Sequence, residues 1–284
     1  DLDGVLGLDI VRTIKDQDDW MPTGHKKDHI PHFLPMSLKE AIRIFVLTCT
    51  VRFWRGQTTA HNSMLVHVTR FTDVQELVSQ LVKDEITLLQ RRLRYGEGSS
   101  LDEVLSEFKY LWNSDFVPTS NSIIGTDLQP IIPFPKWEDI SSFLYQAISR
   151  IQVKKINGTA KDILDYWGSP NGLNVIAIGG DKLSRGLTLE GLSISYYLRA
   201  SKMYDTLMQM GRWFGYRPGY LDLCRLYTTD ELVEWYRHIT VASEELRKEF
   251  DYMSNMNSTP EEFGLKVRTH PSGLIITGAN KMRN

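Results

Sequence analysis

Two short segments of the chain carry residues whose types and spacing suit the handling of phosphate groups. In the first, VIAIGGDKLSRGLTLEGLSISYYL, an apolar run leads directly into Gly179 and Gly180. Glycines at such a turn let backbone amides approach a phosphate, because no side chain stands in the way. Polar and small residues that could line the same turn follow at Asp181, Arg185, Gly186 and Thr188. A tight surface turn with a solvated arginine accounts for the same spacing, so the segment alone leaves both interpretations open.

The second segment, YDTLMQMGRWFGYRPGY, sets three polar side chains among large apolar ones: Gln209, Arg212 and Arg217. A guanidinium group is planar and permanently charged, so it suits the charge that develops on a phosphoryl group during transfer. The alternative is an amphipathic helix that buries Trp213 and Phe214. Taken singly, this segment favours the alternative.

The elements around these segments alternate between strands and helices. Short apolar runs predict strands at 64–68, 174–178, 192–198 and 222–227. Longer periodic stretches predict helices at 72–93 and 204–214, and a helix that begins at Ser37, with Ser37 and Glu40 as its capping box. This alternation predicts an α/β fold with a mostly parallel sheet and helices on both faces. In such folds, ligands bind beyond the carboxyl ends of the strands.

The chain divides into a short arm and one large domain. Residues 1–35 are predicted to form an N-terminal arm or linker, because HKKDHIPHFLP is polar and punctuated by prolines. The histidines at 25, 29 and 32 could surround a metal together with Asp28, but Pro31 breaks the helical spacing and a polar surface arm is favoured. Residues 36–284 are predicted to form a single domain, with an inserted helical region at 97–150.

The composition narrows the class of protein. A formal net charge of −2 gives no overall basic field, so any contact with nucleic acid has to be local. The two cysteines, Cys49 and Cys224, have no CxxC partner, which predicts a reducing, cytoplasmic setting. No apolar stretch approaches the roughly 20 residues that span a bilayer, so we expect no membrane contact. The chain begins at Asp1 without an initiator methionine, and we expect it to be part of a longer protein.

Taken together, the two segments resemble motifs V and VI of superfamily-two helicases, and MLVHVTRF with the helix after it is similar to motif IV. A closer resemblance is to the Z1 (Z-one) domain family of helicase-like ATPases, which occur in bacterial restriction and defence systems and often carry an endonuclease label. The hallmarks of that family read here as LPMSLKEAI, SMLVHVTR, GGDKLSRGLTLEGL, YDTLMQMGRWFGYRPGY, STPEEFGLKVRTHP and ITGANKMR. The resemblance extends over residues 34–283.

The resemblance implies a RecA-like domain with the fold of P-loop NTPases, the second of two such domains in an ATP-driven motor. It further implies that one group of residues lines a cleft toward an ATP-bearing first domain or a nucleic-acid backbone: Gly179, Gly180, Asp181, Arg185, Gly186 and Thr188. Arg212 and Arg217 would be arginine fingers, and Gln209 would couple ATP to the nucleic acid. Two features depart from the common helicase pattern. Thr188 occupies a position where many helicases have Asp, and the two arginines are five residues apart instead of three.

The sequence contains no GxxxxGK loop followed by Ser or Thr, and no DExH-type box. We therefore expect ATP and Mg²⁺ to be bound mainly by an N-terminal RecA-like domain, and this chain alone to hydrolyse little ATP. The expected track is DNA. In a restriction setting, a separate nuclease subunit is the expected partner.

Two other functions stay open. An endonuclease domain needs a cluster of acidic and basic residues, and the nearest candidates, Glu262 and Lys266, are loosely spaced. A non-catalytic docking module would use the aromatic residues of the inserted region, Trp112, Phe116, Phe134, Trp137 and Phe143. For these residues the ordinary aromatic core of a helical subdomain is favoured.

Overall fold

The structure, a computed structural model, describes residues 8–156, 164–166, 168–180, 189–198, 207 and 219–256. The chain forms two compact units. Residues 8–199 and 216–228 make up the sheet unit, and residues 1–7, 200–215 and 229–284 make up the other. The predicted helix at 204–214 lies outside the described residues except for Leu207.

Six strands among the described residues form one sheet, in the order β1-β6-β5-β2-β4-β3, and every neighbouring pair is parallel. Their bounds are β1 (Val11–Thr13), β2 (Asn62–His67), β3 (Ile151–Ile156), β4 (Asn174–Gly179), β5 (Leu192–Tyr197) and β6 (Arg225–Thr228). In the central register, Met64 of β2 lies opposite Ile176 of β4 and Ile194 of β5. The predicted α/β class with a mostly parallel sheet is therefore confirmed.

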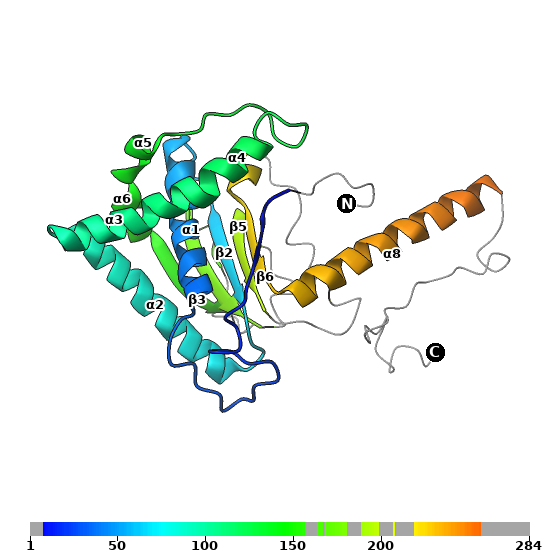
Figure 1. The fold of residues 1–284 in the computed structure, drawn as a ribbon, viewed down its shortest axis with the longest axis horizontal. Helices are drawn as coiled ribbons and strands as arrows, with labels where there is room; N and C mark the ends of the chain where they lie inside the picture. The colour runs from blue at the N-terminus through cyan, green and yellow to red at the C-terminus, as the bar shows by residue number, and fades with distance from the viewer. Residues whose placement is uncertain are drawn as a thin grey trace. The chain divides into compact units, whose positions relative to one another are not determined.

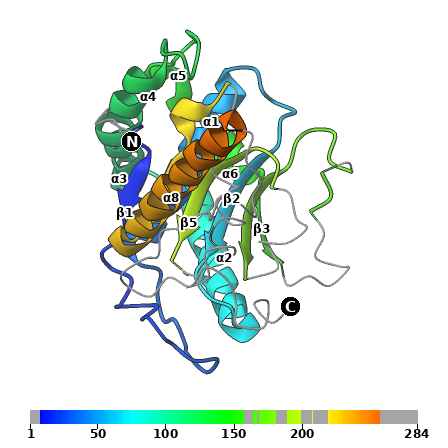
Figure 2. The same cartoon turned by 90° about the vertical axis from the view of Figure 1, so that its right-hand side faces the viewer.

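The described helices of the sheet unit gather on one face of the sheet, where α1 packs on β5, and α2 packs on β3 and β4 (Figures 1 and 2). Their bounds are α1 (Met36–Trp54), α2 (Thr72–Tyr95), α3 (Ser99–Leu111), α4 (Val117–Ile123), α5 (Trp137–Ser141) and α6 (Leu144–Ser149). A π-helical turn, Trp112–Phe116, joins α3 to α4. In the other unit, α8 (Asp230–Asn255) begins after Thr229, whose hydroxyl accepts a hydrogen bond from the amide of Leu232. None of the helices within the described ranges is both long and apolar enough to cross a bilayer.

The central strands are buried on both faces. Every residue of β2, β4 and β5 is buried, which explains the continuous apolar runs MLV in β2 and VIAI in β4. In β5, LSISYY, buried serines alternate with the apolar residues. Alternate residues such as Val66, Ile178 and Tyr196 join the main core against the helices. Residues of the opposite face, such as His67 and Ser195, are buried as well.

Helix α1 begins differently from the prediction. Its N-cap is Pro35, and no side chain of the first turn caps it, so the predicted capping box of Ser37 and Glu40 is wrong. Instead, the distant carboxylate of Asp16 accepts a hydrogen bond from the amide of Ser37 at 3.0 Å, and a second from its hydroxyl. The same hydroxyl lies 2.8 Å from the Tyr196 hydroxyl. A tertiary contact thus replaces the local cap that the sequence suggested.

The described part of the predicted N-terminal arm belongs to the sheet unit. It contains β1, which pairs with β6 at the edge of the sheet. Trp20 and Met21, which follow β1, are 2% and 3% exposed. Residues 8–35 therefore contribute an edge strand and part of the core, which a linker would not do.

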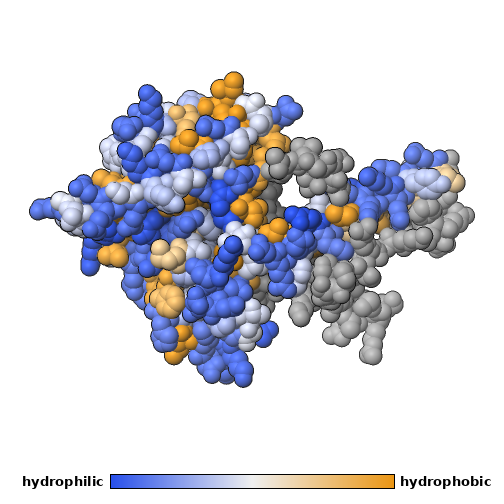
Figure 3. Space-filling model, viewed as in Figure 1, coloured by the Kyte–Doolittle hydropathy of each residue, from blue (hydrophilic) through white to orange (hydrophobic). Residues whose placement is uncertain are grey.

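The inserted helical region carries an aromatic core, not an aromatic docking face. Trp112 and Phe116 are buried, and the Trp112 ring stacks on Phe134 with centroids 4.9 Å apart. The exposed large hydrophobic residues of this region are others: Tyr110 in α3, and Leu128 and Ile131 in the loop between α4 and α5. Figure 3 shows hydrophobic residues gathered over that loop, above a largely hydrophilic surface along α2 and α3.

Candidate functional site

The carboxyl ends of the parallel strands lie along one edge of the sheet, called the carboxyl edge, which is the lower edge in Figure 1. The opposite edge is called the amino edge. At the centre, β2 lies between β4 and β5. After β2 the chain continues to β3 on one side, and after β5 it continues to β6 on the other. Connections that leave neighbouring strands in opposite directions open a crevice, and such crevices are the usual ligand sites of α/β sheets.

The first of the two segments singled out in the sequence leaves β4 at this edge, and the chain that leads to the second leaves β5 there. β4 ends at Gly179, and Gly180 follows it directly. β5 ends at Tyr197, and the amide of the next residue, Leu198, donates to the carbonyl oxygen of His67 at 3.1 Å. Because β2 separates β4 from β5, the two starting points lie on either side of the end of β2.

Gly180 packs against the chain that leaves β2. A Cβ atom at this position would lie 2.7 Å from Gln75 Nε2, 3.3 Å from the carbonyl oxygen of Thr69 and 3.4 Å from the Cα of Arg70. The Gln75 amide itself donates to that carbonyl oxygen at 3.1 Å. A side chain at position 180 would therefore have to displace Gln75, which gives a packing reason for the glycine beside its expected role near phosphate.

Thr69 takes part in three of the polar contacts at this edge, including the one from Gln75. Its hydroxyl lies 2.8 Å from His25 Nε2 and accepts a hydrogen bond from the amide of Phe71 at 3.2 Å. The next residue, Arg70, is exposed, and its guanidinium lies over the Phe71 ring, 4.8 Å from the centroid. No acidic side chain of the described residues lies within ion-pair distance of Arg70.

A buried histidine ends β2 at the crevice. His67 is fully buried, and its ring centroid lies 5.1 Å from that of Tyr197, which ends β5 and is fully buried too. The two aromatic rings therefore pack together where β2 and β5 end.

The structure describes only part of the predicted site. Gly179 and Gly180 lie at the carboxyl edge, as expected from the end of a buried strand. The other predicted site residues lie outside the described residues: Asp181, Arg185, Gly186, Thr188, Gln209, Arg212 and Arg217. The sequence did not single out Thr69, Arg70 or Gln75 as site residues, and it offered His25 only as a possible metal ligand. The one signal for Thr69 and Arg70 was the segment SMLVHVTR, which ends on Arg70.

The chain returns from the second segment at the opposite edge. Gly219 has a φ of +80°, and its carbonyl oxygen accepts a hydrogen bond from Gln57 Nε2 at 3.5 Å, just before β2 begins. The ring of Tyr220 lies under the guanidinium of Arg52 at 4.2 Å. The stretch between Leu198 and Gly219 therefore starts at the carboxyl edge and ends at the amino edge.

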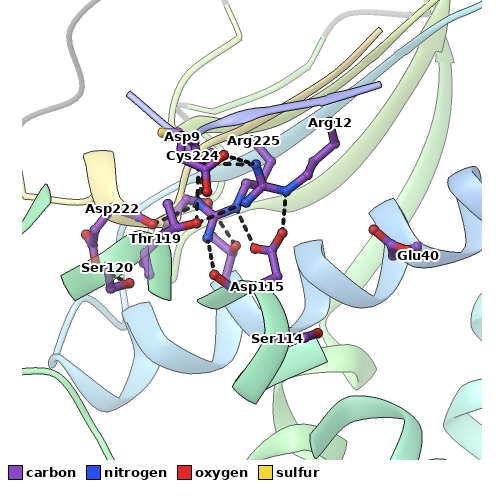
Figure 4. Close-up of polar contacts among 12 residues, drawn as sticks. Asp9, Arg12, Glu40, Ser114, Asp115, Thr119, Ser120, Asp222, Cys224 and Arg225 are labelled. Carbon is purple, nitrogen blue, oxygen red and sulfur yellow. Dashed lines mark hydrogen bonds and ion pairs between the residues drawn. The ribbon is translucent and has the colours of Figure 1, made fainter. Parts of the chain in front are cut away.

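A buried charge network ties the inserted region to β1 and to the amino end of β6 (Figure 4). The carboxylate of Asp115, in the π-helical turn, accepts hydrogen bonds from Arg12 of β1 and from Arg225 of β6, the latter at 2.6 Å. Asp222, which is fully buried, accepts two bonds from Arg55 at 2.7 and 3.1 Å. Because these charges are paired and buried, the network is a structural device that orients β1, β6 and the inserted helices.

A groove of about 630 Å³ opens beside β1 and the first turn of α1. Burial raises the pKa of Glu40 there, although the hydroxyl of Tyr227 donates to this carboxylate at 3.0 Å and acts in the opposite direction. Arg43 in the same groove is paired with Glu85 and Glu107. Charges of both signs line the groove, so it has no evident preference for one class of ligand. In the described part of the chain, no three metal-binding side chains converge.

The comparisons with known proteins identify the family. The family model of the Z1 domain matches residues 37–274. The chain belongs to the Z1 domain family. The matched range takes in the carboxyl ends of β2 to β6 and both segments singled out in the sequence, but not β1 or His25. Comparison with curated proteins and with solved structures gave no significant match.

Proposed function

We propose that this Z1 domain is the C-terminal RecA-like half of an ATP-driven DNA translocase, a helicase-like motor of a bacterial restriction or defence system. One observation carries the proposal. The first phosphate-handling segment and the chain toward the second leave the sheet at its carboxyl edge, on either side of β2. That is the position where α/β sheets bind their ligands.

The motifs present and absent in the sequence indicate which of the two domains supplies each part of the proposed ATP site. An N-terminal RecA-like domain binds ATP and Mg²⁺, because the present chain has no phosphate loop. In the reaction, water attacks the γ-phosphorus, the bond to the β–γ bridging oxygen breaks, and ADP, phosphate and a proton are released. An arginine from this chain stabilises the negative charge on the transferring phosphoryl group, and Gln209 couples the nucleotide to the DNA.

Arg212 is the stronger candidate for the arginine finger. Arg217 precedes Gly219 by two residues, and Gly219 lies at the amino edge beside Gln57. Arg212 is further from this fixed point along the chain, and we assign the finger to it.

DNA contacts come from the carboxyl edge. The backbone at Gly179 and Gly180 ends β4 at this edge, and Arg70, whose Cα packs against Gly180, is an exposed cation without an acidic partner among the described residues. In the same proposal, Asp181, Arg185, Gly186 and Thr188 line the cleft. Contacts to the phosphate backbone carry no base information, so the motor tracks along DNA, and a separate nuclease subunit cuts it.

The proposal is tested by DNA-stimulated ATP hydrolysis in the protein that carries this domain together with its N-terminal RecA-like domain. Arg212→Ala should lower the stimulated rate by roughly 10³-fold, because a finger stabilises charge only in the transition state. Arg91→Ala, which removes an exposed arginine from α2, is the matched control and should leave the rate unchanged.

Three outcomes would contradict the motor. An unchanged rate for both Arg212→Ala and Arg217→Ala would contradict the proposed role of either residue as an arginine finger. Robust ATP turnover by this chain alone would show that no other domain is needed for nucleotide binding. Mg²⁺-dependent DNA cleavage by this chain alone would favour an endonuclease instead.

A further inference from the structure

The loop of residues 25–32, called here the histidine loop, is held against the carboxyl edge by its own histidines. His25 Nδ1 donates to the carbonyl oxygen of Pro22 at 3.1 Å, and His25 Nε2 lies 2.8 Å from the Thr69 hydroxyl. His29 Nε2 donates to the carbonyl oxygen of Trp20 at 2.7 Å. Trp20 is buried, so the loop is fixed to the core at one end and to the end of β2 at the other.

For a neutral His25 ring, the bond to Pro22 sets the direction of the contact with Thr69. In the neutral ring only one nitrogen carries a proton, and Nδ1 uses it toward Pro22. Nε2 is then the acceptor, and the Thr69 hydroxyl donates to it while accepting from the amide of Phe71. The His25 ring also lies edge-on to the Phe71 ring, with centroids 5.8 Å apart. The loop is therefore positioned by directional bonds and by packing.

This attachment gathers cations at the crevice. Lys26 follows His25, and Arg70 follows Thr69, so the His25–Thr69 contact brings together the two segments of backbone that carry these cations. Lys26, Lys27 and Arg70 are exposed, and none has an acidic partner within ion-pair distance among the described residues. The acidic side chains nearest in the chain are Asp28 in the loop and Asp73 in the first turn of α2. Residues 25–32 and 69–73 together carry these three cations and two acidic side chains, an excess of one positive charge in a chain of net charge −2.

We propose that the histidine loop is a second contact for the DNA backbone, in which Lys26 and Lys27 bind phosphates and His25 positions them next to Arg70 and Gly180. This inference rests on the proposed motor function and adds a binding element to its carboxyl edge. The lysines act as point charges on a sequence-independent track. The anchored loop loses less conformational freedom on binding than a free arm would, which favours affinity.

The first test measures the salt dependence of DNA binding by this chain, with a mixed-sequence duplex as the probe. Each phosphate contact contributes about 0.9 to the slope of log K against log salt. Lys26→Ala with Lys27→Ala should therefore reduce the slope by about 2 and weaken binding by roughly 50-fold at 0.1 M salt. The matched double variant, Lys109→Ala with Lys136→Ala, removes two exposed lysines elsewhere and should leave the slope unchanged.

The possible outcomes distinguish a failure of the histidine-loop proposal from a failure of the proposed motor function. An unchanged slope in the Lys26 and Lys27 variant, with DNA binding intact, overturns the role of the loop and leaves the proposed function standing. An equal loss of slope in both double variants shows a diffuse charge effect and also overturns it. A wild-type chain that binds no DNA contradicts the loop contact and the proposed track together.

The second test addresses the anchor. His25→Ala keeps both lysines but releases the loop, and should weaken DNA binding by roughly three- to tenfold while the salt slope changes little. Thr69→Val removes the hydroxyl that His25 contacts and should have a similar effect. Because both act on one bond, the double variant should be no weaker than either single variant. Full DNA affinity in His25→Ala, with thermal stability maintained, would contradict the positioning role.

Discussion

The charged side chains at the two edges of the sheet differ in burial and in pairing. At the amino edge such side chains are buried and paired: Arg52 donates to Asn62 Oδ1 at 2.6 Å, and Arg55 makes two bonds with Asp222. At the carboxyl edge, Arg70 and the lysines of the histidine loop are exposed and have no acidic partner among the described residues. A buried pair maintains the fold, whereas an exposed cation can meet a ligand. The amino edge is thus the structural edge, and the carboxyl edge is the one suited to binding.

The glycines at the two edges differ in the same way. At the amino edge, Gly191 has a φ of +64°, and a Cβ there would lie 1.7 Å from the backbone oxygen of His61. At the carboxyl edge, Gly180 has no unusual φ, and its nearest neighbour would be the movable end of the Gln75 side chain at 2.7 Å. A side chain at position 191 would therefore meet rigid backbone first. A side chain at position 180 would first meet the Gln75 side chain, with the backbone oxygen of Thr69 at 3.3 Å.

The largest effect that this comparison predicts is on stability at the amino edge. Asp222→Ala leaves the buried guanidinium of Arg55 without its carboxylate and should lower the free energy of unfolding by about 3–5 kcal/mol. Arg70→Ala at the carboxyl edge should change it by less than about 0.5 kcal/mol, as exposed substitutions do. Urea unfolding followed by circular dichroism measures both. Equal losses in the two variants would remove the distinction between the edges.

The glycines give a second, smaller contrast. Gly191→Ala combines a left-handed backbone with a clash against His61 and should cost about 2–4 kcal/mol. Gly180→Ala should cost about 1 kcal/mol, because Gln75 can move aside at the expense of its bond to Thr69. Thermal unfolding of the two variants tests the order. In a Gly180→Ala, Gln75→Ala double variant the two losses should not add.

The smallest expected effect concerns the groove beside β1. Burial raises the pKa of Glu40 above its ordinary value of 4.5, so the folded chain binds a proton more tightly than the unfolded one. The stabilisation from this group is complete below the ordinary pKa and is lost as pH rises through the higher pKa of the folded state. Glu40→Gln should therefore remove part of the decline in stability with rising pH. Urea unfolding at a series of pH values tests this, and identical pH profiles for the variant and the wild type would contradict it.

The sequence predicted the elements that depend on local pattern. The apolar runs of β2, β4 and β5 and the long periodic stretch of α2 lie within one or two residues of their predicted bounds. The cap of α1 was missed, because Asp16 lies 21 residues before Ser37 and reaches it only in the folded chain. Asp115 and Asp222 were missed for a related reason. A carboxylate is expected at the surface unless its partners are known, and here they are distant arginines.

For the candidate site as well, the sequence predicted local features and missed contacts between distant residues. Gly179 and Gly180 could be predicted because a glycine pair after a buried strand is a local signal. The contact between His25 and Thr69 joins residues 44 apart in the sequence, and no periodicity connects them. The stretch around His25 was predicted to be an arm from its polarity alone. Its histidines bond to Trp20 and Thr69, and these bonds bring the stretch to the carboxyl edge.

The most direct test of the binding edge is amide hydrogen exchange of this chain with and without a DNA duplex. We predict that DNA slows exchange in peptides that cover Thr69, Arg70 and Gly180, while peptides at the amino edge around Asn62 and Asp222 are unchanged. Such a pattern would place the DNA at the carboxyl ends of β2 and β4. Protection confined to the amino edge, or no protection at either edge under conditions where DNA is bound, would contradict the account.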